Sequence, residues 1–228
     1  MKYLDARRLT GPNVLWNKPG SVLDIHCSPA EADRLIPFCE AELRRMLTAV
    51  GWGDESICHL RLLTGISIAF SAPIDALYAA SAINEWVWTA CDAEFNDAEA
   101  VDFDEKAAEI RAAIAEEINP RLLELERAAA DHGIAFLWDD DEVSLGHGSG
   151  SETWGFRSLP EPTSLDWSGY SNVPVGIVTG TNGKTTTVRI AKHLLQVAGR
   201  TVGLSCTDWV SVNDEIIDRD DWSGPGGA

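Results

Sequence analysis

The sequence predicts an α/β protein in which an α+β module precedes the first β–α–β unit of a second domain. Up to residue 157, apolar residues recur with the periods of both strands and helices. From residue 171, a continuous apolar run is followed by a glycine-rich turn and an amphipathic helix, an order typical of parallel α/β units. Residues 158–170 between them, SLPEPTSLDWSGY, are rich in Pro and Ser. We therefore expect a module at 1–157, a linker at 158–170 and the incomplete beginning of a domain at 171–228.

Composition and charge exclude several classes of protein. The 228 residues are 45% hydrophobic and 24% charged, which is ordinary for a globular protein. The sequence has no apolar run long enough to cross a membrane and no signal-peptide core at its start, so we expect no membrane contact and a cytoplasmic location. The net charge of −18 would repel a phosphate backbone, so we expect no nucleic-acid partner. The oligomeric state is not predicted.

The five cysteines indicate a reduced protein. Their number is odd, their spacing is wide and no C-x-x-C pair occurs. This pattern favours reduced, mostly buried thiols over disulfides or a metal site. The residues are Cys27, Cys39, Cys58, Cys91 and Cys206.

The first half of the module alternates short strands with longer helices. Residues 22–26 can form a strand, and Ser28-Pro29-Ala30-Glu31 has the form of a capping box with proline at the first helical position. Pro37 would break an interior turn, so a helix start near Pro37 stays open as the alternative. Two further strands, 60–63 and 66–70, flank Thr64-Gly65. Residues 74–91 then read as a helix that is apolar on most sides and therefore buried.

The second half of the module predicts two helices and a strand pair. The helices span 103–118 and 120–132, and the second is bounded by a capping Asn119 and a terminating Gly133. Strands at 134–138 and 143–146 enclose an acidic turn, Asp139-Asp140-Asp141-Glu142. A solvated hairpin turn is favoured there over a cation site. The glycine-rich residues 146–151 are interpreted as a flexible loop rather than a second anion-binding nest.

The second domain opens with a strand–turn–helix. Residues 173–179 form a continuous apolar run, as in a strand buried on both faces of a parallel sheet. Residues 180–183 form a tight turn, and a helix from Lys184 ends at Gly199. A strand at 201–207 completes the β–α–β unit.

The end of the chain predicts a hairpin and a loop. Residues 210–217 favour a hairpin that turns at Asn213-Asp214. Residues 224–228, GPGGA, are typical of a loop.

The segment Val175–Thr187, VGIVTGTNGKTTT, predicts a phosphate cradle for ATP with Mg²⁺. Its glycines permit positive φ and close approach of the backbone, and the following helix offers its N-terminal N–H groups to an anion. Lys184 can reach the β- and γ-phosphates and is our catalytic candidate, and the Thr185 hydroxyl can ligate the metal. The strict P-loop pattern fails because Val178 replaces its first glycine, and a plain glycine turn with a surface lysine is the alternative. The expected ATP-binding residues are Gly180, Thr181, Asn182, Gly183, Lys184, Thr185 and Thr186.

The run Thr179–Thr187, TGTNGKTTT, closely resembles the ATP-binding loop of the Mur ligase superfamily. This superfamily includes peptidoglycan precursor ligases, folylpolyglutamate synthase and the C-terminal part of cyanophycin synthetase. Thr207-Asp208, residues 221–228 (DWSGPGGA) and residues 9–13 (LTGPN) look like cyanophycin synthetase and its relatives. The chain has no room for the ATP-grasp domain of those enzymes, so it resembles the ATP-grasp-free relatives. Trp209 stands where the family usually has glycine.

The resemblance implies an ATP-dependent, ADP-forming ligase that joins a carboxylate to an amine through an acyl phosphate. An amino acid or peptide would be the substrate, and Asp208 is a candidate contact to substrate or Mg²⁺, with turn capping as the alternative. The resemblance also implies that the chain holds only the start of the P-loop-type Mur central domain. A truncated, non-catalytic nucleotide-binding module is therefore the alternative function. Another P-loop enzyme, such as a kinase, is disfavoured by Val178 and the threonine run.

Overall fold

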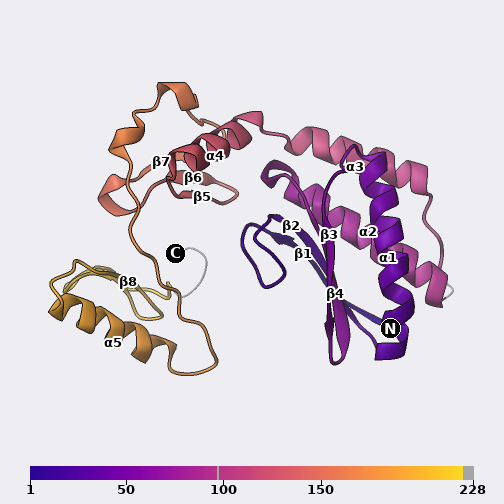
Figure 1. Cartoon of the computed structure of the whole chain (residues 1–228), viewed down its shortest axis with the longest axis horizontal. Coiled ribbons are helices and arrows are strands. Elements are labelled where there is room, and N and C mark those ends of the chain that lie inside the picture. The colour runs from indigo at the N-terminus through magenta and orange to yellow at the C-terminus, as the bar shows by residue number, and fades with distance from the viewer. Residues whose placement is uncertain (97, 223–228) are drawn as a thin grey trace. The chain divides into compact units, whose positions relative to one another are not determined.

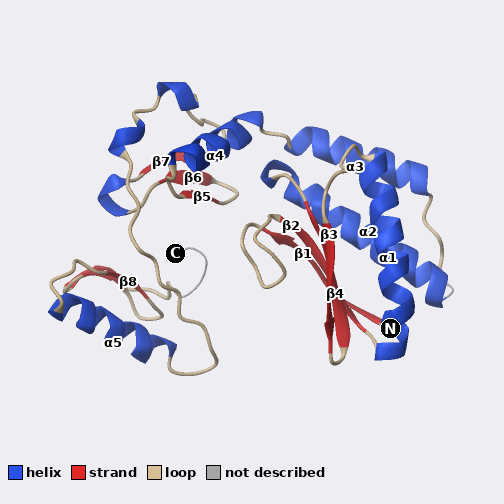
Figure 2. Ribbon diagram, in the orientation of Figure 1, coloured by secondary structure: helices blue, strands red, loops and turns tan. Residues whose placement is uncertain are grey.

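The computed structural model describes residues 1–96 and 98–222, and its mixture of helices and sheets is compatible with the predicted α/β class, although every strand pair in these residues is antiparallel (Figures 1 and 2). The chain divides into two compact units, Met1–Asn172 and Val173–Ala228. Residues 158–170, for which the sequence predicts a linker, lie in the first unit and form two short 3₁₀ turns, Pro162–Ser164 and Trp167–Gly169. The loop expected at 224–228 falls outside the described residues.

A four-stranded antiparallel sheet organises the first unit. Its strand order is β1-β2-β4-β3, so the two central strands are covered by neighbours on both edges. The strands predicted at 22–26 and on either side of Thr64-Gly65 are confirmed, whereas β1 was not predicted. The strands are β1 (Lys2–Leu9), β2 (Gly20–His26), β3 (Ile57–Leu62) and β4 (Gly65–Ser71).

Three helices lie on one side of this sheet (Figure 1). Alternate residues of the central strands, such as Leu23, Ile25 and Phe70, are fully buried in a core that they share with α1 and α2. The predicted helix at 74–91 begins instead as a 3₁₀ turn, Ile74–Ala76, before α2. The helices are α1 (Pro29–Ala49), α2 (Leu77–Asn96) and α3 (Phe103–Glu117).

Helix α1 starts at its capping box, and the alternative start near Pro37 is wrong. The Ser28 side chain accepts from the Glu31 amide, and the Glu31 carboxylate accepts from the Ser28 amide at 2.7 Å. The helix then continues through Pro37, which lies on its exposed side. Packing of the opposite face, which includes the fully buried Cys39 and Leu43, outweighs the hydrogen bond that proline cannot make.

The expectation of mostly buried cysteines is confirmed. All five are free, and each except Cys58 is buried. The sulfurs of Cys39 and Cys91 lie 3.0 Å apart between α1 and α2. Their hydrogen bond, together with burial, raises the pKa of the Cys91 thiol.

A second, smaller core completes the first unit. Helix α4 keeps its predicted bounds, because the Asn119 side chain accepts from the Leu122 amide and Gly133 ends the helix with a φ of 67°. The strand pair is confirmed, and an unpredicted third strand, β7, gives the order β5-β6-β7. In the acidic turn, Asp140 forms an ion pair with Arg8. The elements are α4 (Pro120–His132), β5 (Phe136–Trp138), β6 (Glu142–Leu145) and β7 (Glu152–Gly155).

In residues 173–222, the second unit holds one helix and a small antiparallel sheet of order β10-β9-β8. The predicted hairpin is confirmed, and Asn213 in its turn adopts a φ of 48°. The predicted helix is also confirmed, whereas the strand expected at 201–207 is shorter. The elements are α5 (Lys184–Val197), β8 (Gly203–Ser205), β9 (Val210–Val212) and β10 (Glu215–Asp218).

Residues 173–179 differ from the prediction, because they form no strand. Val175 is 65% exposed and Ile177 is 87% exposed, rather than buried on two faces. A strand exists only where a neighbouring strand accepts and donates its ladder hydrogen bonds, and among the described residues β8 pairs with β9 alone, so its other edge has no partner strand in residues 173–179. The expected β–α–β crossover is therefore not present in the described part of this unit.

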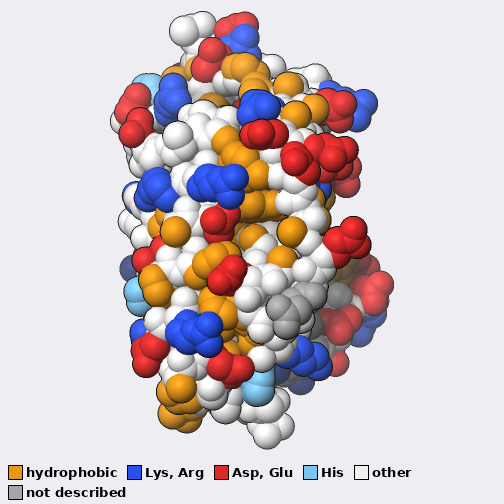
Figure 3. Space-filling model, turned by 90° about the vertical axis from the view of Figure 1, so that its right-hand side faces the viewer, with side chains coloured by type: hydrophobic (Ala, Val, Ile, Leu, Met, Phe, Trp, Pro, Cys, Tyr) orange, Lys and Arg blue, Asp and Glu red, His pale blue; other side chains and the backbone are white. Residues whose placement is uncertain are grey.

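One face of the molecule carries charges of both signs. On the face that Figure 3 presents, Lys and Arg side chains are scattered, and Asp and Glu side chains lie between them. Within residues 1–96 and 98–222, no helix has the length and apolar character needed to cross a membrane.

Candidate nucleotide-binding site

The candidate site is built on the turn that leads into α5. Gly180 has a φ of 139° and Gly183 a φ of 80°, and Gly183 occupies the N-cap position of the helix. No side chain caps this end of α5, and Gly183 contributes only its carbonyl, which accepts from the Thr187 amide at 2.9 Å. The first N–H groups of the helix are therefore available to an anion, and the helix dipole favours one there.

Backbone conformation, rather than crowding, explains why glycine stands at these positions. A Cβ added to Gly183 would meet no atom within 4 Å, and one added to Gly180 would come no closer than 3.9 Å to the Asn182 carbonyl oxygen. Both φ values nevertheless lie in the region that L side chains disfavour. Open space above a positive-φ turn is what a bound phosphate group requires.

The side chain of Lys184 folds back over the turn that precedes it. Its Nζ donates to the Gly180 carbonyl at 2.7 Å, so the ammonium group lies over the loop that precedes it. Thr181 and Asn182 at the tip of the turn are exposed. The Lys184 ammonium can exchange this single carbonyl partner for a phosphate oxygen, because nothing else in the described residues holds it.

Thr185 links the first helical turn to the segment after β8. Its Oγ1 lies 3.3 Å from the Oγ1 of Thr207, and Thr186 beside it is exposed. Thr207 was not among our predicted site residues. The Thr207-Asp208 dipeptide at the end of the predicted strand was the available signal, since polar residues at strand ends line ligand sites in α/β proteins.

The Asp208 carboxylate is paired with a cationic side chain of α5. Its carboxylate forms an ion pair with Arg189, and the Arg189 guanidinium lies 4.2 Å from the centre of the Trp209 ring. Sequence reasoning missed Arg189. The signal was its spacing, because Thr185 and Arg189 are four residues apart and therefore share a face of α5.

Helix α5 is a basic element in an acidic protein. Its fourteen residues, KTTTVRIAKHLLQV, include Lys184, Arg189 and Lys192 and contain no Asp or Glu, although the whole chain has a net charge of −18. Lys192 donates to the Oγ of the fully buried Ser211 at 3.0 Å. Arg189 is already paired with Asp208, so Lys184 is the cation of α5 that favours a phosphate-bearing ligand at its N-terminus.

The residues present fit a nucleoside triphosphate with a divalent cation. The uncapped helix N-terminus and Lys184 supply donors for phosphate oxygens, and the Thr185 hydroxyl supplies one oxygen for the metal. In the part of the chain that the structure describes, no group of three or more His, Cys, Asp or Glu residues forms a metal site. A cation here would therefore take most of its oxygens from phosphate and water, as Mg²⁺ does in phosphate sites.

Comparison with known proteins points to one group. The chain is 43% identical over 58 residues to cyanophycin synthetase from Synechocystis sp., and 42% identical over 55 residues to the cyanophycin synthetases from Crocosphaera subtropica and Geminocystis herdmanii. This similarity supports a relationship to the cyanophycin synthetases. The matches cover 24–25% of the chain but only 6–7% of those proteins' lengths. No family model matches the chain.

Proposed function

We propose that this chain carries the ATP-binding loop of an ATP-dependent, ADP-forming ligase that joins a carboxylate to an amine. The observation that carries the proposal is the placement of Lys184 and Thr185 directly after a positive-φ glycine, at the uncapped N-terminus of a basic helix. The similarity to cyanophycin synthetase supports the ligase class. An amino acid or peptide is the proposed substrate, and the cytoplasm, where ATP is available, is the proposed location.

Each residue of the turn has a defined role in this proposal. The amides of the first helical turn and the Lys184 ammonium would bind the phosphate oxygens and neutralise charge as it develops. Thr185 would hold Mg²⁺, which supplies further neutralisation of the phosphates when bound. A substrate carboxylate oxygen would attack the γ-phosphorus, releasing ADP and leaving an acyl phosphate. An amine would then attack its carbonyl carbon and release phosphate.

A pair of matched variants tests nucleotide binding. Lys184→Ala removes the ammonium of the turn, whereas Arg200→Ala removes an exposed cation beyond the end of α5. We expect ATP with Mg²⁺ to raise the melting temperature of the wild-type chain and of Arg200→Ala, because a ligand that binds the folded state stabilises it. Lys184→Ala should show no shift. An equal shift in all three proteins would mean that the turn is not the site.

A second candidate function is nucleotide binding without turnover. The pairing of Asp208 with Arg189 favours it, because a carboxylate held by a guanidinium is not free to serve as a metal ligand or substrate contact. Incubation with ATP, Mg²⁺ and a panel of amino acids and peptides distinguishes the two functions. ADP release that depends on substrate supports the ligase, and ATP binding without ADP release supports the second candidate.

A further inference from the structure

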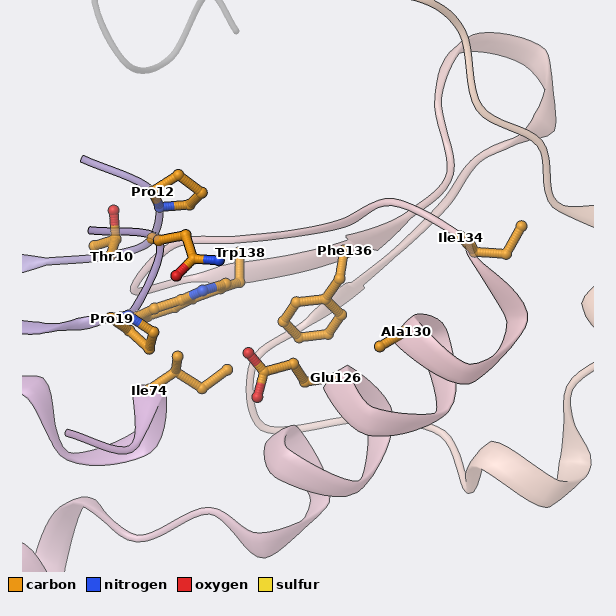
Figure 4. A pocket seen from close by; sticks show the side chains of 11 residues that line it. Thr10, Pro12, Pro19, Ile74, Glu126, Ala130, Ile134, Phe136 and Trp138 are labelled. Atoms are coloured by element: carbon orange, nitrogen blue, oxygen red, sulfur yellow. The ribbon is translucent and has the colours of Figure 1, made fainter. Parts of the chain in front are cut away.

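The first unit contains a cavity of about 230 Å³, far along the sequence from the phosphate turn. It lies between the loop that joins β1 to β2, the 3₁₀ turn before α2, helix α4 and strand β5 (Figure 4). All of these elements belong to the same compact unit. None of the cavity residues takes part in the proposed nucleotide site, so the cavity needs an explanation of its own.

Most of the side chains that line this cavity are apolar. Ile74 is 4% exposed, and the half-buried rings of Phe136 and Trp138 come from β5. Pro19 and Ala130 lie beside them (Figure 4). Apolar and aromatic walls with few polar groups are the usual composition of a small-molecule site.

Glu126 is the charged residue among the cavity residues. Its side chain projects from α4 into the space beside Ile74 and Phe136 (Figure 4). No hydrogen bond or ion pair involves its carboxylate within residues 1–96 and 98–222. Burial raises the pKa of Glu126; Arg127 on the same helix lowers it, and Asp75 on the 3₁₀ turn raises it further. An ionised carboxylate in these surroundings costs free energy until a cation joins it.

We propose that this cavity binds a small organic cation, a primary ammonium or guanidinium group on an apolar stem, with Glu126 as its counter-ion. The carboxylate would accept hydrogen bonds from the cation, and the faces of Phe136 and Trp138 would contact the cation and its stem. The side chains of Thr10 and Asn17, which also line the cavity, form no hydrogen bond in the described residues and can serve a polar end of the ligand.

The volume of the cavity and the net charge of the chain limit the choice of ligand. The volume lies below the ~300–1,000 Å³ typical of sites for drug-sized ligands, so the cavity suits one amino-acid-sized group. The chain's net charge of −18 raises the local concentration of cations and disfavours anions. An inorganic cation would leave the aromatic walls unused.

Titration of the full chain with three compounds of similar size tests the proposal. n-Butylammonium and n-butylguanidinium carry the two candidate head groups, and n-butanol is their neutral counterpart. We expect saturable one-to-one binding of at least one cation, followed through the indole N–H resonance of Trp138, and no binding of n-butanol at the same concentrations. The cation that binds with the higher affinity identifies the head group that the cavity prefers.

Three variants locate the binding. Glu126→Gln should weaken cation binding by at least about tenfold, since it removes a charge-assisted hydrogen bond. Ala130→Leu should weaken it by filling the cavity while Glu126 is kept. Asp131→Asn, which removes an exposed carboxylate from the same helix, should leave the affinity within about twofold, because a surface charge acts only through a screened field.

The melting temperature tests the role of Glu126 independently of ligand binding. Because burial raises its pKa, the ionised side chain should destabilise the folded state at neutral pH, and Glu126→Gln should raise the melting temperature there. Cation binding that is unchanged in Glu126→Gln, or no binding of either cation by the wild type, would overturn the proposal. A lower melting temperature for Glu126→Gln would also overturn it, because it would assign the carboxylate a structural role.

Discussion

The φ angle of Gly183 determines how the proposed phosphate site is shaped. Its φ of 80° places the Lys184 amide at the start of α5, although no neighbouring atom crowds the position. Gly183→Ala should therefore cost about 1–2 kcal/mol in this conformation and weaken ATP binding by roughly tenfold as the turn rearranges.

The control for this variant is Gly176→Ala. Gly176 also has open space around it but does not have a positive φ. Isothermal titration with ATP and Mg²⁺ should show wild-type affinity for Gly176→Ala. Equal losses in the two variants would argue against a conformational requirement at Gly183.

Glu31 gives a pH dependence at the start of α1. Hydrogen bonds from the Ser28 amide and hydroxyl, and then from the N-terminal ammonium, lower the pKa of Glu31 from 4.5 to about 2. The folded state thus favours the ionised form. Its stabilisation is complete above the unfolded pKa of 4.5 and disappears as the pH falls toward 2.

Urea unfolding measured between about pH 5 and about pH 2 checks this dependence. The wild type should lose more free energy of unfolding over this interval than Glu31→Gln, which cannot titrate. Glu116→Gln, at an exposed position of α3, should follow the wild type. Parallel pH profiles for the wild type and Glu31→Gln would contradict the assignment.

At the scale of elements, α1 continues through a proline because its packing compensates for the break. Pro37 cannot donate the hydrogen bond that the Asp33 carbonyl would accept, and it lies on the exposed side. Pro37→Ala should therefore raise the free energy of unfolding by about 1–3 kcal/mol, as measured by chemical denaturation. Pro120→Ala, at the first position of α4, should change it by less than about 1 kcal/mol. Equal effects would show that Pro37 is accommodated without cost.

Elements with local signals could be predicted, and elements that depend on distant partners could not. The bounds of α4 follow from Asn119, Pro120 and Gly133, which act on their immediate neighbours. Strand β1, KYLDARRL, was missed because its charged residues hide the alternation of an edge strand. Residues 173–179 are apolar enough for a buried strand, but apolar character does not report whether a partner strand is present.

In the candidate site, too, features with local signals could be predicted and features that depend on distant residues could not. The turn at residues 180–183 and the start of α5 at Lys184 could be predicted, because glycine conformation and helix initiation are local properties. The pairing of Arg189 with Asp208 could not, since it depends on how the segment after β8 returns to the helix. The cavity around Glu126 was also missed, because its residues come from four separate stretches of sequence.

At the scale of the whole molecule, the boundary between the two units should be the site of first cleavage. Residues 173–179 are mostly exposed and form no strand, so a protease can bind them without unfolding either unit. Brief digestion with thermolysin should cut before Val175 or Ile177, as identified by mass spectrometry. Ile177→Asp should remove its own cleavage product. A first cut inside the first unit would contradict the division.

We propose that ATP with Mg²⁺ binds at the turn before α5, and amide chemical-shift mapping follows this binding residue by residue. Titration of the isotope-labelled chain should produce its largest shifts at residues 180–187 and at Thr207, whose hydroxyl lies beside Thr185. These shifts should diminish when Mg²⁺ is withheld and should be lost in Lys184→Ala. Shifts that are absent, or that cluster away from this turn, would contradict the claim.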